Sequence, residues 1–217
     1  MTFNKDPWSA ATHFVGFLAA IVGVVFLVLP SIGSTPKVVA MAIYGGSLIA
    51  LFLASSVYHF FDLGHRGNRW LKRLDHSAIF LLIAGSYMPP MVHLLDGPLR
   101  VTMLAVIGTI ALLGVVVKLL WIDSPTWIGL SLYLALGWIV LVPAWWMFPV
   151  MAPGGLLLLA AGGVAYTLGA VVYARRWPDP WPATFGHHEV WHLFVVAGAA
   201  LHYWFMATLV SAPVPAF

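Results

Sequence analysis

Residues 38–61 read VVAMAIYGGSLIALFLASSVYHFF, a run that contains no Asp, Glu, Lys or Arg. An α-helix needs about 20 apolar residues to cross the hydrocarbon core of a bilayer, so this run is long enough. The whole chain has the same character, since 62% of its 217 residues are hydrophobic and 8% are charged. An ordinary soluble domain has about 25% charged residues. We therefore expect residues 1–217 to form one transmembrane domain.

Six further apolar runs flank this one, and the breaks between the runs are short and carry Pro, Gly, Ser and charged residues. Short connections favour antiparallel packing of neighbouring helices. The fold expected is an all-α membrane protein, a seven-transmembrane helical bundle. The predicted spans are residues 13–30, 38–61, 75–92, 99–121, 126–148, 152–174 and 187–210.

The basic residues divide unequally between the two sides of this topology. One side holds Lys5, Arg66, Arg69, Lys72, Arg73, Lys118, Arg175 and Arg176, and the other holds only Lys37 and Arg100. Because cytoplasmic loops are enriched in Lys and Arg, the N-terminus is predicted to be cytoplasmic and the C-terminus to lie outside. Basic residues beside the membrane match anionic lipid headgroups, so no nucleic-acid partner is expected.

The ligands available for a metal are restricted, because the chain has no cysteine and nine histidines. Any metal must therefore be held by imidazole, carboxylate or water. Ionisable side chains inside a membrane span are costly, so each is a candidate functional residue. This criterion selects the few polar residues near the span ends.

Four such residues share one depth at the cytoplasmic side. His59 ends the second span, Asp75 opens the third, and His188 and His192 lie on one face of the first turns of the seventh. Three imidazoles are a ligand set of open zinc sites, in which a water takes the fourth position. We therefore predict a zinc site of His59, His188 and His192.

The other histidines have a simpler interpretation. A single histidine near a helix end usually bonds a carbonyl or reaches the interface, which is the expectation for His13, His65, His76 and His93. His202 lies about 15 Å beyond His192 at 1.5 Å per residue, so it cannot bind the same ion. No role follows from the sequence for His13 or His202.

A competing motif lies at residues 188–192, which read His-Glu-Val-Trp-His, the HExxH pattern of zinc metalloproteases with Glu189 as the general base. Leu95-Asp96-Gly97 also resembles the Leu-Asp-Gly of intramembrane site-2 proteases. Asp96 is expected on the outer side, however, about 30 Å of hydrocarbon away from His188 and His192. The protease pattern is therefore interpreted as coincidental.

Three separated motifs identify a more consistent resemblance. They are Ser55-x-x-x-His59; Leu74-Asp75-His76-Ser77-Ala78-Ile79-Phe80 followed by Gly85-Ser86-Tyr87-Met88-Pro89; and His188-x-x-x-His192-Leu193-Phe194. In these motifs, and over nearly its whole length, the chain resembles the hemolysin III proteins, the bacterial branch of the progestin and adipoQ receptor (PAQR) superfamily.

This resemblance implies a seven-helix bundle in the bacterial inner membrane, with zinc held by His59, His188 and His192. It also implies that Asp75 contacts the metal through water. The chain departs from the family at Ser9, where the family usually has Asn four residues before the Thr/Ser-His of the first helix. A contact made by that Asn is therefore not assured.

The function expected is hydrolysis of a membrane lipid amide or ester that enters from the inner leaflet. Asp75 would help to deprotonate a zinc-bound water, and Ser55 would help to stabilise the oxyanion. Related families that resemble ceramidases favour this hypothesis. Two alternatives are a non-catalytic sensor or regulator of membrane lipid state with structural zinc, and a cytolytic pore, although no ring of pore-lining charge is present.

Overall fold

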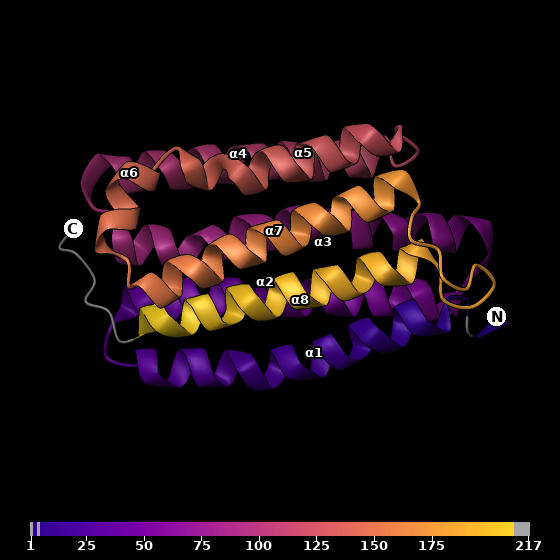
Figure 1. Ribbon diagram of the computed structural model, residues 1–217, viewed down its shortest axis with the longest axis horizontal. Coiled ribbons are helices and arrows are strands. Elements are labelled where there is room, and N and C mark those ends of the chain that lie inside the picture. The colour runs from indigo at the N-terminus through magenta and orange to yellow at the C-terminus, as the bar shows by residue number, and fades with distance from the viewer. Residues whose placement is uncertain (1, 4, 211–217) are drawn as a thin grey trace.

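Long apolar helices run side by side along the molecule in the computed structural model, which describes residues 2–3 and 5–210 (Figure 1). The long helices are α1 (Pro7–Val28), α2 (Thr35–Phe60), α3 (Gly64–Leu94), α4 (Gly97–Leu120), α5 (Thr126–Trp138), α7 (Pro153–Arg175) and α8 (His187–Val210). The 3₁₀ turn η1 (Leu29–Ser31) continues α1, and two short antiparallel strands, β1 (Thr2–Phe3) and β2 (Phe61–Asp62), pair beside the end of α2. α1 begins and α8 ends at opposite ends of the bundle (Figure 1).

The segment expected as one helix over residues 126–148 is bent. α5 is followed by the turn η2 (Ile139–Leu141), the short helix α6 (Ala144–Met147) and the turn η3 (Phe148–Val150), and the axis turns by 42°. Pro143 precedes α6 and cannot donate the backbone hydrogen bond that a continuous helix needs. The described chain thus has six helices able to cross a membrane, or seven if the bent pair is one span.

The third helix begins at Gly64, well before the expected start at Asp75. Its first turns are polar and basic, so they carry no apolar signal. Arg69 and Lys72 in these turns lie 2.6 and 3.9 Å from the Asp123 carboxylate in the α4–α5 connection. As a result, Asp75 lies well inside a continuous helix, where the backbone fixes its position.

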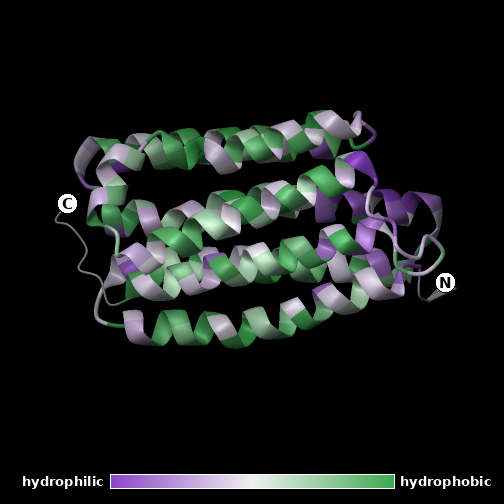
Figure 2. Cartoon of the chain, viewed as in Figure 1, coloured by the Kyte–Doolittle hydropathy of each residue, from purple (hydrophilic) through white to green (hydrophobic). Residues whose placement is uncertain are grey.

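The helices are mainly hydrophobic along their middle parts, and hydrophilic residues gather towards the ends of the bundle (Figure 2). Phe26, Leu112 and Leu157 are 64–70% exposed although each lies within a long helix. Exposed apolar side chains in such numbers are unfavourable in water and are satisfied by lipid. The chain is therefore a multi-pass helical membrane protein.

Close helix packing depends on one of the two adjacent glycines of α2. A Cβ on Gly45 would collide with the Val24 side chain of α1, whereas a Cβ on Gly46 would have no neighbour within 4 Å. Small residues let membrane helices approach closely. Gly45 therefore sets the α1–α2 distance, and this packing brings the start of α1 beside the end of α2.

Candidate metal centre

Three histidines from two helices converge at the end of the bundle where α2 ends and α8 begins. His59 lies in the last turn of α2, and His188 and His192 lie one turn apart near the start of α8. The Nε2 atom of His188 is 3.5 Å from Nε2 of His59 and 3.2 Å from Nε2 of His192. One nitrogen from each ring can be chosen so that all three lie within 4.8 Å of one another.

This geometry fits a metal ion. Nitrogens that are each about 2.05 Å from a tetrahedral ion lie about 3.3 Å from one another, close to the two observed separations of 3.2 and 3.5 Å. His59 and His192 are buried, so their rings are held away from water by the surrounding helices. The three residues can therefore hold a metal ion.

A fourth histidine packs against this group. The His13 ring of α1 stacks on the His192 ring with a centroid separation of 3.9 Å, and its edge faces the Phe52 ring at 5.1 Å. Neither nitrogen of His13 has a hydrogen-bond partner within the part of the chain that the structure describes. The bond to a backbone carbonyl expected for an isolated histidine is therefore not observed for His13.

Asp75 and Ser55 form a polar pair next to the three histidines. Both are buried, with 5% and 2% of their surface exposed, and the Ser55 hydroxyl is placed to donate a hydrogen bond to the Asp75 carboxylate. Ser55 lies one helical turn before His59 on α2. Asp75 is outside the group of mutually close ligand nitrogens, but it lies near enough to interact electrostatically with His59.

A second carboxylate, on Asp6, contacts the metal centre and was missed in the sequence. Its Oδ2 lies 2.9 Å from Nδ1 of His59. The hydrogen bond with His59 is the largest cause of a lowered pKa of the Asp6 carboxyl. Asp6 precedes the first apolar run, so a search for polar residues within predicted spans could not select it; a charged residue immediately before a helix was the only available signal.

The remaining histidines do not join the centre. His93 packs near the far end of α3 with Nδ1 2.7 Å from the Pro89 carbonyl oxygen, as expected for an isolated histidine. His202 uses Nε2 to contact the Leu159 carbonyl oxygen of α7 at 3.4 Å, and its ring fills the space that Gly162 leaves open. His65 is exposed in the first turn of α3.

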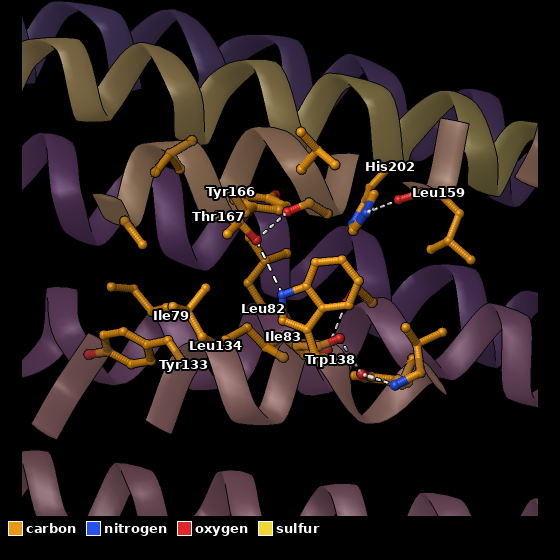
Figure 3. Close-up of a pocket in the computed structure, with 18 of the residues that line it drawn as sticks. Ile79, Leu82, Ile83, Tyr133, Leu134, Trp138, Leu159, Tyr166, Thr167 and His202 are labelled. Atoms are coloured by element: carbon orange, nitrogen blue, oxygen red, sulfur yellow. Dashed lines mark hydrogen bonds between the residues drawn. The ribbon is translucent and has the colours of Figure 1, made fainter. Parts of the chain in front are cut away.

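A cavity of about 320 Å³ extends from the Ser55–Asp75 pair into the bundle. Its walls are mainly aliphatic and aromatic side chains of α2, α3, α5, α7 and α8. Figure 3 shows Trp138 of α5 and Thr167 of α7 meeting across it, where the indole nitrogen donates to the Thr167 hydroxyl at 3.2 Å. The arrangement can place an apolar chain beside a polar, buried centre.

Comparison with known proteins identifies the family. The sequence profile of the family described as "Haemolysin-III related" matches residues 1–203. The chain belongs to this family.

Its similarity to individual haemolysin III relatives covers most of each protein. It is 32% identical to the "Hemolysin-3 homolog" of Bacillus subtilis over 92% of this chain and 91% of that protein. It is 33% identical to "Hemolysin-3" of Bacillus cereus over 91% and 88%. The "Monocyte to macrophage differentiation factor" of Homo sapiens is 32% identical over 89% and 79%, so the similarity extends to PAQR-type proteins.

Glu189, the acidic residue of the HExxH motif in this haemolysin III chain, makes structural contacts. One carboxylate oxygen of Glu189 accepts a bond from the Ser9 hydroxyl of α1 at 2.9 Å, and the other accepts from the Gly186 backbone N–H at 2.8 Å. The contact between Ser9 and Glu189 joins α1 to α8. Asp96, the third ligand of the protease pattern, directly precedes α4, which begins at the end of the bundle opposite to the start of α8 (Figure 1), so the protease interpretation fails.

Proposed function

We propose that this protein is a zinc-dependent hydrolase of a membrane lipid amide or ester. The observation that carries the proposal is that the Asp75–Ser55 pair, which lies next to the three histidines, lines one end of a mainly apolar cavity. To test this proposal, zinc-loaded protein is incubated with mixed lipid amides and esters, and the released fatty acid is measured by mass spectrometry. If no such lipid is hydrolysed by protein that carries zinc, the proposal is wrong.

The proposed topology is one domain with seven spans in the bacterial inner membrane, with the N-terminus cytoplasmic. The opposite positions of the start of α1 and the end of α8 support an odd number of crossings, with the bent α5–α6 pair as one of them. The polar, basic start of α3 lies at the same end as the start of α1, in agreement with the positive-inside rule. The metal centre then lies near the cytoplasmic face.

Single cysteines can test this orientation, because the chain has none of its own. Asn68→Cys, at the start of α3, is expected to resist an impermeant maleimide added to spheroplasts. Ile32 is 69% exposed and lies in the connection between α1 and α2 at the other end of the bundle. Ile32→Cys is therefore expected to react with the maleimide. The reverse pattern would invert the topology.

Zinc is the proposed ion because the ligands are three imidazoles without thiolate, the set found in open catalytic zinc sites. When bound, zinc would lower the pKa of a coordinated water towards about 7 and so supply a hydroxide at neutral pH.

The protein's own groups would then move the proton and orient the substrate. Asp75 would accept a proton from the attacking water and return it to the leaving nitrogen or oxygen, so that the acyl C–N or C–O bond breaks and a carboxylic acid is released. Ser55 would donate a hydrogen bond to the oxygen of the substrate carbonyl as negative charge develops on it. Burial of both side chains strengthens these interactions.

The cavity supports a lipid as the substrate and a sideways entrance. Trp138, Leu141 and Val164 line the cavity and are also 40%, 56% and 49% exposed on the outside of the bundle. The cavity therefore reaches the lipid-facing surface between α5 and α7. An acyl chain could enter there without crossing water, and its polar head could reach Asp75.

Narrowing this entrance is expected to reduce turnover without loss of metal. Gly163 lines the cavity on α7, and a Cβ there would lie 3.9 Å from the Trp138 ring. Gly163→Leu should lower kcat/KM by roughly tenfold or more, equivalent to about 1.4 kcal/mol. Gly154→Leu, on the same helix at an exposed position without neighbours within 4 Å, is the control. Equal activities of the two variants would exclude this entrance.

The alternative is a sensor or regulator of membrane lipid state in which zinc has a structural role. The ligands come from α2 and α8, so one ion would tie these helices together next to the lipid cavity. A lipid that zinc-loaded protein binds without turnover would favour this alternative over hydrolysis.

A further inference from the structure

We propose that Asp6 is a positioning residue of the metal centre, whose carboxylate orients the His59 ring so that Nε2 faces His188 and His192. The inference rests on the metal binding proposed above. It assigns a function to the segment that precedes the first membrane helix.

The contact with Asp6 determines which nitrogen of His59 carries the proton and which is available to bind a metal. An ionised carboxylate can only accept hydrogen bonds, so Nδ1 of His59, 2.9 Å from Oδ2 of Asp6, must carry the proton. The other nitrogen, Nε2, then carries the lone pair. Nε2 is the atom 3.5 Å from His188, inside the metal-binding group.

Asp6 is held in place by contacts that do not involve its carboxylate. Its backbone N–H donates to the His59 carbonyl oxygen at 3.0 Å. The neighbouring Lys5 ammonium lies 3.8 Å from the centre of the Tyr58 ring, and β1 pairs with β2 immediately after α2. The carboxylate therefore meets His59 without first having to be ordered, which is the arrangement expected of a preorganised support.

The Asp6 and His59 side chains differ in solvent exposure in a way that allows Asp6 to remain charged. The His59 side chain is 3% exposed, whereas the Asp6 side chain is 39% exposed. Water on its outer side lets the carboxylate keep its charge without the full cost of burial. On its inner side, the carboxylate holds the His59 ring in one orientation, as in carboxylate–histidine–zinc arrangements.

Only one of the three ligands has this support within the described residues. His188 makes contacts through Nε2 to the other two histidines and has no hydrogen-bonded carboxylate. The Nδ1 atom of His192 has no hydrogen-bond partner there. Loss of Asp6 therefore removes the one carboxylate that orients a ligand.

Zinc affinity of the full-length protein in detergent, measured by competition with a chromophoric chelator, tests the inference. Asp6→Ala should weaken zinc binding about 10- to 100-fold, the usual effect of losing such a partner. Asp123→Ala is the matched control, because it also removes a partly exposed carboxylate from an ionic contact, with Arg69 at 2.6 Å, but one that involves no ligand. The control should bind zinc like the wild type.

Asp6→Asn separates the effect of the carboxylate's charge from the effect of its hydrogen bond to His59. Its amide oxygen can still accept from Nδ1, so zinc binding should be weakened less than in Asp6→Ala. In NMR spectra of the metal-loaded protein, the proton resonance of the His59 Nδ1–H group should lie furthest downfield in the wild type. It should move upfield in Asp6→Ala. A purely structural effect would not give this order.

The outcomes distinguish this inference from the proposed metal function. If wild-type protein takes up no zinc, the metal function fails and the role of Asp6 fails with it. If the wild type binds zinc and Asp6→Ala binds it equally well, only the role of Asp6 is overturned. The same conclusion follows if Asp6→Ala and Asp123→Ala weaken zinc binding to the same extent.

Discussion

Replacing His59, His188 and His192 together by alanine is expected to remove zinc from the protein. Wild-type protein purified in detergent should carry about one zinc per chain, and the variant should carry essentially none, because no thiolate is available to replace three imidazole ligands. Elemental analysis of both proteins at equal concentration measures this. The melting temperature of the wild type should also fall after chelation, since an ion that binds only the folded state stabilises it.

The control for this experiment is His202→Ala. It removes another partly buried histidine from α8, but one that contacts Leu159 and not the ligand group. Its zinc content should equal that of the wild type. A wild-type protein without zinc after purification in zinc-containing buffer would contradict the proposed centre, as would a triple variant that keeps its zinc while remaining folded.

Asp75→Asn is expected to abolish hydrolysis while zinc remains bound. The amide has nearly the shape of the carboxylate and can still bond Ser55, but it cannot accept the proton, and loss of a general base costs about 10²- to 10⁴-fold in rate. Asp75 is not among the mutually close ligand atoms, so the metal content should be unchanged. The measurement pairs kcat for fatty-acid release with zinc content in the same preparation.

Ser77→Ala supplies the comparison on the same helix. Ser77 is buried two residues beyond Asp75, its hydroxyl has no hydrogen-bond partner among the described residues, and it does not line the cavity. Its turnover should match the wild type. Full activity in Asp75→Asn would rule out its role as the base, and zinc lost together with activity would make Asp75 a part of the metal support instead.

Much of the membrane architecture could be predicted from composition and apolar runs. Segments such as α2 and α8 could be predicted as membrane helices because most of their side chains are apolar. The family match confirms the identification made from the Ser55–His59, Asp75 and His188–His192 motifs. The convergence of His59 with His188 and His192 could be predicted as well, because helix direction alone places these residues at one end of the bundle. Their use as zinc ligands stays a prediction.

Other features could not be read from hydropathy. The start of α3 at Gly64 lies in a basic segment that resembles a loop, and the bend before α6 depends on how Pro143 is accommodated. Asp6 was missed because its importance comes from a contact with a residue 53 positions away, which no local pattern reveals. The stacking of His13 on His192 is likewise a product of α1–α8 packing.

The separation of the metal ligands along the chain has a consequence for biosynthesis. His59 and His188 are 129 residues apart, and His188 lies at the start of α8. During translation α2 therefore enters the membrane long before its partner ligands exist, and the centre cannot assemble until α8 has been inserted. If the three histidines bind a metal as proposed, the ion can be acquired only after the bundle is complete, because a chain interrupted before α8 lacks two of the three ligands.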